Sequence, residues 1–110
     1  MFKLPVYSKN QVLLLALSDV VHLESDGHYT NVYTRNQKHF CNLSLSDLET
    51  RLNPQQYIRT HRSHLINIQH AKRFEKLGDN YLVIMDDEKE SAIPVSRGKV
   101  QELKQILGLA

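Results

Sequence analysis

Cysteine, tryptophan, glycine and proline are scarce in this sequence, and each scarcity excludes a class of protein. The chain has one cysteine, Cys41, no tryptophan, four glycines and three prolines. A single cysteine cannot form an internal disulfide, and so few glycines and prolines exclude a collagen-like fibre. The longest apolar run, residues 12–17, is far shorter than the roughly 20 residues of a membrane-spanning helix. We therefore expect a cytoplasmic domain without a membrane segment.

The length and charge of the chain further restrict the class of protein. With 110 residues and 41% hydrophobic residues, the sequence predicts one folded domain over residues 1–110. The net charge is only +2, but residues 51–76 are strongly basic and residues 86–90 are mostly acidic. The basic segment indicates a polyanionic partner. The acidic run is expected to be the solvated tip of a hairpin.

Short alternating segments rich in β-branched and aromatic residues dominate the chain, and they predict a mainly β protein. Polar turns separate these segments, which favours several small antiparallel sheets over a doubly wound sheet or a helix-turn-helix. Ser46 and Glu49 form a capping-box pattern that predicts a short helix near residues 47–52. Apolar residues at helical spacing predict a second, C-terminal helix near residues 99–107. Strands are expected at residues 20–24, 29–34, 39–43, 57–59, 63–68, 71–77, 81–85 and 93–95.

No constellation of residues in the sequence indicates an enzyme, a metal site or a cofactor site. His61 and His64 are three residues apart, and in one extended strand this odd spacing directs them to opposite faces. No second cysteine or matching carboxylate accompanies them, so the ligand set of a structural zinc site is incomplete. Cys41 occupies a strand position, where a small buried thiol is the better interpretation than a nucleophile. Phosphate-binding and nucleophile-elbow motifs are absent.

Three polar segments could bind an anion. Residues 59–64 combine arginine, hydroxyl and imidazole donors, each of which can bind a phosphate, and arginine can also grip guanine. Residues 94–99 form a basic loop before the last helix. Residues 26–30 offer an imidazole, a phenol and a hydroxyl around Gly27. Each segment alone is weak evidence, because polar edges often serve only to keep a protein soluble.

Together these segments resemble the LytTR DNA-binding domain of bacterial transcription regulators. The resemblance covers residues 12–107 and lies in four blocks: Leu23-Glu24-Ser25-Asp26-Gly27-His28-Tyr29, Leu48-Glu49-Thr50-Arg51-Leu52, Tyr57-Ile58-Arg59-Thr60-His61-Arg62-Ser63-His64-Leu65-Ile66-Asn67 and Ile93-Pro94-Val95-Ser96-Arg97. It implies a β-rich fold of three small antiparallel sheets in a β-β-β arrangement. It also implies sequence-specific binding of duplex DNA by loops that enter successive grooves.

The resemblance implies which residues contact DNA. They are His28, Tyr29, Thr30, His61, Arg62, Ser63, Arg97 and Lys99. Glu24, Arg59 and Asn67 are implied to support the fold or these loops. The family further implies paired, direct-repeat DNA sites, a domain that is monomeric when free and dimeric on DNA, and a separate receiver or sensor domain in a one- or two-component regulator.

Two other classes of function stay open at this point. A protein-interaction module could use the acidic run at residues 86–90 to dock on a basic surface. An RNA-binding domain could reuse the basic strands, with Tyr57, Phe74 and Tyr81 stacking on unpaired bases. These aromatics are expected to belong to the core instead, because the chain has no tryptophan to fill it.

Overall fold

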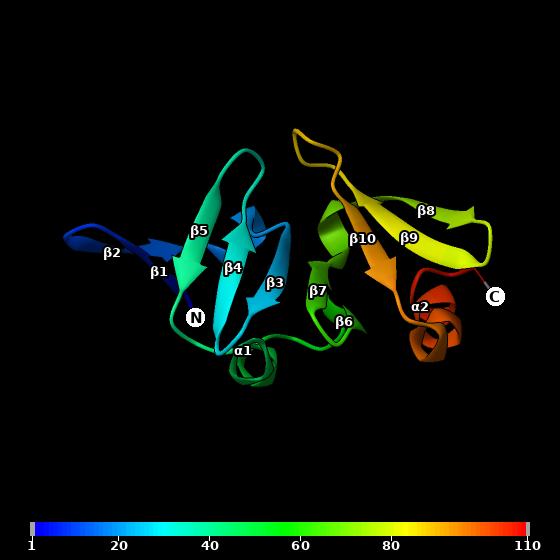
Figure 1. The fold of residues 1–110 in the computed structure, drawn as a ribbon, viewed down its shortest axis with the longest axis horizontal. Helices are drawn as coiled ribbons and strands as arrows, with labels where there is room; N and C mark the ends of the chain where they lie inside the picture. The colour runs from blue at the N-terminus through cyan, green and yellow to red at the C-terminus, as the bar shows by residue number, and fades with distance from the viewer. Residues whose placement is uncertain (1, 110) are drawn as a thin grey trace.

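The computed structural model describes residues 2–109, so Met1 and Ala110, which the predicted domain includes, lie outside the described residues. The molecule is elongated, with extents of 45 × 27 × 26 Å. Strands dominate, and short helices cap the sheets (Figure 1). The elements are β1 (Leu4–Ser8), β2 (Gln11–Leu15), η1 (Leu17–Asp19), β3 (His22–Asp26), β4 (Tyr29–Tyr33), β5 (Lys38–Cys41), α1 (Leu45–Arg51), β6 (Tyr57–His61), β7 (His64–Asn67), η2 (Ile68–His70), β8 (Ala71–Leu77), β9 (Asn80–Met85), β10 (Ala92–Val95), η3 (Arg97–Lys99) and α2 (Val100–Ile106).

The strands form two antiparallel sheets, which confirms the mainly β prediction. Seven strands follow the order β2-β1-β5-β4-β3-β7-β6, and three follow the order β10-β9-β8. The resemblance implied three small sheets. Hydrogen bonds between β3 and β7, with Leu23 opposite Leu65, join two of the small units into the seven-stranded sheet.

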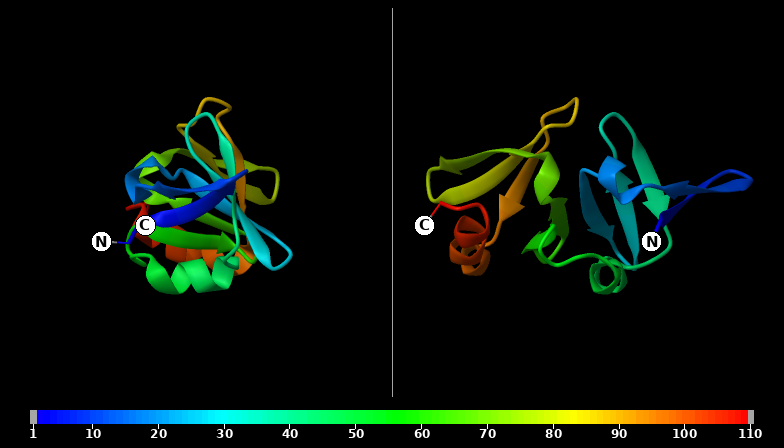
Figure 2. Two further views of the ribbon diagram at one scale, coloured as in Figure 1. Left: turned by 90° about the vertical axis from the view of Figure 1, so that its left-hand side faces the viewer. Right: turned by 180° about the vertical axis from the view of Figure 1, so that it is seen from behind.

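The N-terminal hairpin of β1 and β2 was not predicted as strands. It projects from one end of the molecule (Figure 2, right), where Leu4 faces Leu15 and Val6 faces Leu13. Leu4 and Val6 are fully buried, but Leu14 on the other face is 62% exposed. The continuous apolar run at residues 12–17 masks this alternation, because the run carries apolar residues on both faces of the strand.

Both helices begin close to where the sequence predicts them, but the first has a different cap. The Asp47 N–H donates to Oγ of Ser44 at 3.1 Å, so the N-cap is Ser44 and not Ser46. The earlier start places Leu45 and Leu48 on the buried face of α1. A turn of 3₁₀ helix, η3, precedes α2, so the predicted helix near 99–107 is α-helical from Val100 to Ile106.

Two hydrophobic clusters hold the sheets together. The first lies between the seven-stranded sheet and α1, and the second joins β6 and β7 to the three-stranded sheet and α2. Tyr57 belongs to the first, and Phe74 and Tyr81 pack against the second. These aromatics are thus in or beside the cores, as expected.

The acidic run at residues 86–90 is not a fully solvated tip. Asp87 is only 7% exposed and accepts hydrogen bonds from the N–H and the hydroxyl of Ser91. The Glu88 N–H donates to the carbonyl of Arg35 at 2.9 Å, and Arg35 donates back to the carbonyl of Asp86. The acidic run, which forms the β9–β10 loop, is therefore hydrogen-bonded to the β4–β5 loop at the top of the molecule in Figure 1.

Candidate nucleic-acid interface

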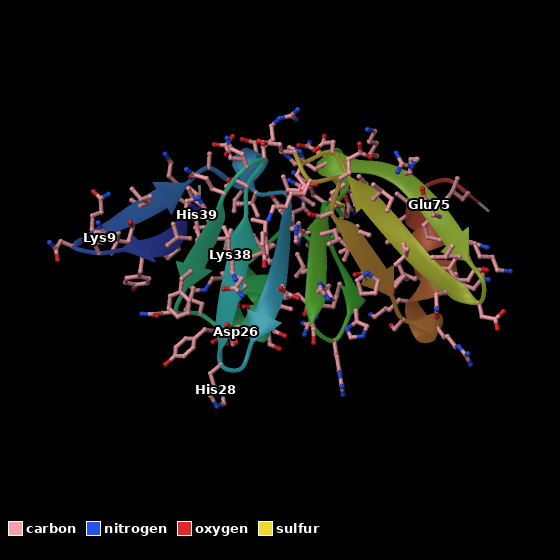
Figure 3. All side chains as sticks on the ribbon, turned by 45° about the horizontal axis from the view of Figure 1, so that its top comes forward. Lys9, Asp26, His28, Lys38, His39 and Glu75 are labelled. Atoms are coloured by element: carbon pink, nitrogen blue, oxygen red, sulfur yellow. The ribbon has the colours of Figure 1, made fainter. Side chains whose placement is uncertain are left out.

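The three polar segments singled out in the sequence lie along one edge of the molecule, here called the loop edge. It consists of the β3–β4 turn at Gly27 and His28, the β6–β7 turn at Arg62 and Ser63, and residues 96–99 after β10. All three lie along the lower side of Figure 1, and Figure 3 shows His28 pointing away from the ribbon at the same edge. The loop edge is opposite the loops that carry Arg35 and Asp86.

Backbone hydrogen bonds connect the three parts of the loop edge. The Ser25 N–H, next to the β3–β4 turn, donates to the carbonyl of Ser63 at 2.9 Å. The Ser96 N–H donates to the carbonyl of Thr60 at 2.8 Å. The β6–β7 turn is therefore the central part, and its two neighbours are each fixed to it.

The β3–β4 turn presents two of its three predicted residues to solvent. Gly27 has a φ of +61°, which a tight two-residue hairpin turn requires. His28 and Tyr29 are exposed, and the Tyr29 ring lies 5.1 Å from that of Phe40. Thr30 is fully buried, and its hydroxyl donates to the carbonyl of Leu43 at 2.8 Å. The Thr30 side chain is therefore not accessible for the predicted DNA contact, because β-strand alternation turns it inward.

The β6–β7 turn corrects the expectation for the two histidines. His61 and His64 are cross-strand partners that close the turn, and their ring centroids are 5.5 Å apart. They share a face because the chain reverses between them. The Ser63 N–H donates to Nδ1 of His61 at 3.1 Å, which fixes the His61 ring beside the exposed Arg62. Ser63 itself is half-buried.

Burial and neighbouring charges determine the protonation of His64. Burial lowers its pKa below the ordinary histidine value, Glu24 opposes this effect and His61 adds to it. Glu24 Oε2 lies 3.9 Å from His64 Nε2. Burial thus favours the neutral form of His64, and the exposed Arg62 supplies a fixed positive charge at this turn.

The three residues implied to support the fold or the loops make hydrogen bonds of both kinds. Glu24 accepts a hydrogen bond from the Tyr33 hydroxyl at 3.1 Å, and burial together with this carboxylate raises the pKa of Tyr33 to about 12. Asn67 is fully buried and donates to the carbonyl of Val20 at 2.9 Å. Arg59 donates to two carbonyls of the β6–β7 turn and to Glu49.

The third part of the loop edge carries Arg97 and Lys99. Both lie in η3, where Arg97 is exposed and Lys99 is half-buried. Lys99 Nζ lies 3.6 Å from Oε1 of Glu102, an exposed pair worth little in water. A Cβ added at Gly98 would meet no atom of the described residues within 4 Å, and Gly98 is exposed.

Three of the six arginines and lysines from residue 51 to residue 76 have a carboxylate partner. Arg59 pairs with Glu49, Lys72 with Glu90, and Arg73 with Glu75 and Glu90. Arg62 and Arg97 form no salt bridge within residues 2–109. Both lie on the loop edge, where an arginine without a partner can bind phosphate or a base edge.

Other chemistry has little support in the described structure. Residues 2–109 contain no group of three or more histidine, cysteine, aspartate or glutamate side chains placed to hold a metal ion. Cys41 is fully buried, and burial raises the pKa of its thiol, so the prediction of a small buried thiol is confirmed. Within the same residues, no helix is long and apolar enough to cross a membrane.

The mainly β fold and the arginines without a carboxylate partner on the loop edge are those expected of a β-sheet nucleic-acid-binding domain. The family described as the LytTr DNA-binding domain matches residues 10–108. The chain belongs to this family of DNA-binding domains.

Curated relatives and a solved structure agree with this assignment. The chain is 46% identical over 109 residues to the "Heme-containing CO-sensing transcriptional regulator RcoM 1" of Paraburkholderia xenovorans, covering 99% of this chain and 41% of the relative. It is 38% identical over 90 residues to the "CO-responsive transcriptional regulator RcoM" of Rhodospirillum rubrum, covering 82% of this chain and 38% of the relative. The LytTr DNA-binding domain of a putative methyl-accepting/DNA response regulator from Bacillus cereus has the same fold, with a TM-score of 0.85 at 23% identity over 98% of both chains. The chain thus spans about two fifths of the length of these curated relatives.

Proposed function

We propose that the loop edge is the DNA-binding surface and that its three parts enter successive grooves of a duplex. The observation that supports this most directly is the alignment of three polar segments, distant in sequence, along one edge of an elongated molecule. The β3–β4 turn and residues 96–99 are hydrogen-bonded to opposite sides of the β6–β7 turn, so a duplex that lies along this edge meets all three parts.

The chemistry of the edge suggests a role for each residue. Arg97 is proposed to read a guanine through two hydrogen bonds, since its guanidinium is exposed and the open backbone at Gly98 permits a close approach. Lys99 is proposed to bind phosphate as a flexible point charge. His28, Tyr29, His61, Arg62 and Ser63 complete the proposed contact set.

The proposed assembly is a domain that is monomeric when free and that binds paired direct repeats as two copies. Sedimentation tests this directly. The free domain is expected to sediment as a monomer, and a duplex with two half-sites is expected to bind a second copy. A tight dimer in the absence of DNA would contradict the assembly and leave DNA binding intact.

The signal that controls the domain is proposed to come from a separate sensor or receiver domain, and the domain itself is proposed to be cytoplasmic and non-enzymatic. The relatives from Paraburkholderia and Rhodospirillum are named as CO-sensing or CO-responsive regulators, and each is more than twice as long as the matched region. The isolated 110-residue domain is thus expected to bind DNA equally well with and without carbon monoxide.

Competition binding tests the proposed function. The preferred duplex is first selected from a random pool and footprinted, and binding is then challenged with a scrambled duplex, single-stranded RNA and heparin. We expect the preferred duplex to bind more tightly than each competitor. Because phosphate contacts release counterions from DNA, its affinity is expected to fall by about a hundredfold or more between low and physiological salt. Equal competition by RNA or heparin, or a flat salt response, would contradict the proposal.

A further inference from the structure

The β6–β7 turn is a two-residue hairpin connection that contains no glycine, asparagine or aspartate. Arg62 and Ser63 are the only residues between the paired His61 and His64. Two-residue hairpins normally adopt type I′ or II′ turns, which require positive φ at one or both central positions. Within residues 2–109, positive φ at non-glycine positions is confined to Lys9 and Glu90. Arg62 and Ser63 thus have negative φ, so the turn lacks the twist that matches paired strands, and contacts from outside it add to its stability.

Arg59 supplies contacts to the turn from the strand that precedes it. Its Nε donates to the carbonyl of His61 at 3.0 Å, and its Nη2 donates to the carbonyl of Arg62. Its side chain is only 18% exposed. Because the guanidinium is a rigid planar fork, one group fixes the relative positions of two successive carbonyls.

Glu49 on α1 fixes the other side of the same guanidinium. Its Oε1 accepts from Nη1 of Arg59 at 2.8 Å. The helix that carries Glu49 is itself fixed by its buried Leu45 and Leu48. The carboxylate also compensates the positive charge of Arg59, in contrast to Arg62, which forms no salt bridge among the described residues.

A β-bulge beside Arg59 connects this arrangement to the rest of the loop edge. The register of β6 and β7 shifts between Arg59 and His61, which leaves Thr60 unpaired in the ladder. The carbonyl of Thr60 is then available to the Ser96 N–H, and the carbonyl of Ser63 accepts from the Ser25 N–H. Fixing the β6–β7 turn thus positions both neighbouring parts of the edge.

We propose that Arg59, held by Glu49, is a positioning residue that sets the DNA sequence discrimination of the domain without contacting DNA. This inference rests on the proposed function of the loop edge. A turn that is only partly in its binding conformation loses affinity for the preferred site in proportion to the fraction lost. Non-specific binding depends mainly on the number of cations near phosphate, and it is unaffected by the precise shape of the turn.

The test compares Arg59→Lys and Glu49→Gln with the parent on the selected duplex and on a scrambled duplex of equal length. If each variant leaves the turn in its binding conformation about one tenth of the time, affinity for the selected duplex falls about tenfold. Affinity for the scrambled duplex is expected to stay within about twofold, with an unchanged salt slope. The matched controls are Arg73→Lys and Glu75→Gln, an exposed pair at 2.8 Å on β8, away from the loop edge (Figure 3). We expect both controls to bind like the parent.

A second readout separates positioning from general damage to the fold. Amide hydrogen exchange is expected to become faster at Ser25 and Ser63 in Arg59→Lys and Glu49→Gln. Exchange at the buried Leu65 and Ile66 is expected to remain as slow as in the parent. Faster exchange throughout the seven-stranded sheet would overturn the proposal, because Arg59 would then stabilise the whole fold and not the turn.

Two DNA-binding results would also overturn the proposal. If Arg59 contacts phosphate, Glu49→Gln strengthens binding to both duplexes because it frees the guanidinium. If Arg59 has no positioning role, discrimination by Arg59→Lys equals that of the parent. Failure of the underlying function has a different signature: the parent itself does not discriminate, and Arg62→Ala binds DNA as the parent does.

Discussion

His22 is expected to limit the stability of the domain in acid, and the size of the effect follows from its surroundings. His22 is 5% exposed and its ring stacks on Tyr33 with centroids 4.3 Å apart, and among residues 2–109 neither ring nitrogen has a hydrogen-bond partner. Burial lowers its pKa to about 4; Asp87 and Glu24 oppose this effect, and His64 adds to it.

The sign of the effect follows from proton linkage. Because the folded pKa of His22 lies below the unfolded value of 6.5, the unfolded chain binds the proton first as the pH falls. The cost is absent above pH 6.5 and grows until the pH reaches the folded pKa. With these two values, linkage gives a loss of about 2 kcal/mol of unfolding free energy between pH 7.5 and pH 5.

His22→Phe removes this titration while it retains an aromatic ring against Tyr33. Since no hydrogen bond is lost, stability at pH 7.5 is expected to change by less than about 1.5 kcal/mol. At pH 5 the variant is expected to gain about 2 kcal/mol relative to the parent. Urea unfolding followed by far-ultraviolet circular dichroism measures both values, with the exposed His28→Phe as control. Equal losses of stability in the parent and in His22→Phe between the two pH values would refute the reasoning.

Three further predictions concern DNA binding and the fold beneath the loop edge. Arg97→Ala is expected to lower the binding free energy for the preferred duplex by about 1 to 3 kcal/mol. Arg97→Lys is expected to retain non-specific binding while losing discrimination at one base pair. If Arg97→Lys discriminates as well as the parent in a binding titration, Arg97 is a phosphate contact. Thr30→Val is expected to destabilise the domain by about 1 kcal/mol in urea unfolding, since it loses the bond to Leu43, with DNA affinity unchanged. Cys41→Ser and a metal chelator are each expected to leave DNA affinity unchanged in the same titration, and loss of binding in either case would revive a redox or metal role.

The strands from β3 to β10 could be predicted from the sequence, but the N-terminal hairpin and the order in which the strands pair could not. Alternation at residues 20–24 and 29–34 gives the hairpin that carries His28. The sequence contains no local signal that β3 pairs with β7, because the two strands are separated by β4, β5, α1 and β6. That non-local pairing places the β3–β4 turn beside the β6–β7 turn.

The errors in the candidate site concern the directions of side chains, which were predicted from residue spacing within a single strand. Successive side chains of a β-strand point to opposite faces, so an outward Tyr29 on β4 implies an inward Thr30. The rule that odd spacing separates side chains fails for His61 and His64, because it holds only while the chain continues in one direction. The contacts of Arg59 depend on the folded turn, and the resemblance alone implied its supporting role.

The hydrogen bonds that join the three parts of the loop edge also bear on how its DNA preference could be altered. Since the carbonyls of Thr60 and Ser63 position neighbouring loops, substitutions in two loops are coupled, and their free-energy effects on binding are not expected to add. A double-mutant cycle between His28 and Arg62 would measure that coupling. A change in the preferred DNA sequence of such a domain is therefore expected to require simultaneous substitutions in adjacent loops. Variants in which only one loop is exchanged are expected mostly to bind DNA more weakly.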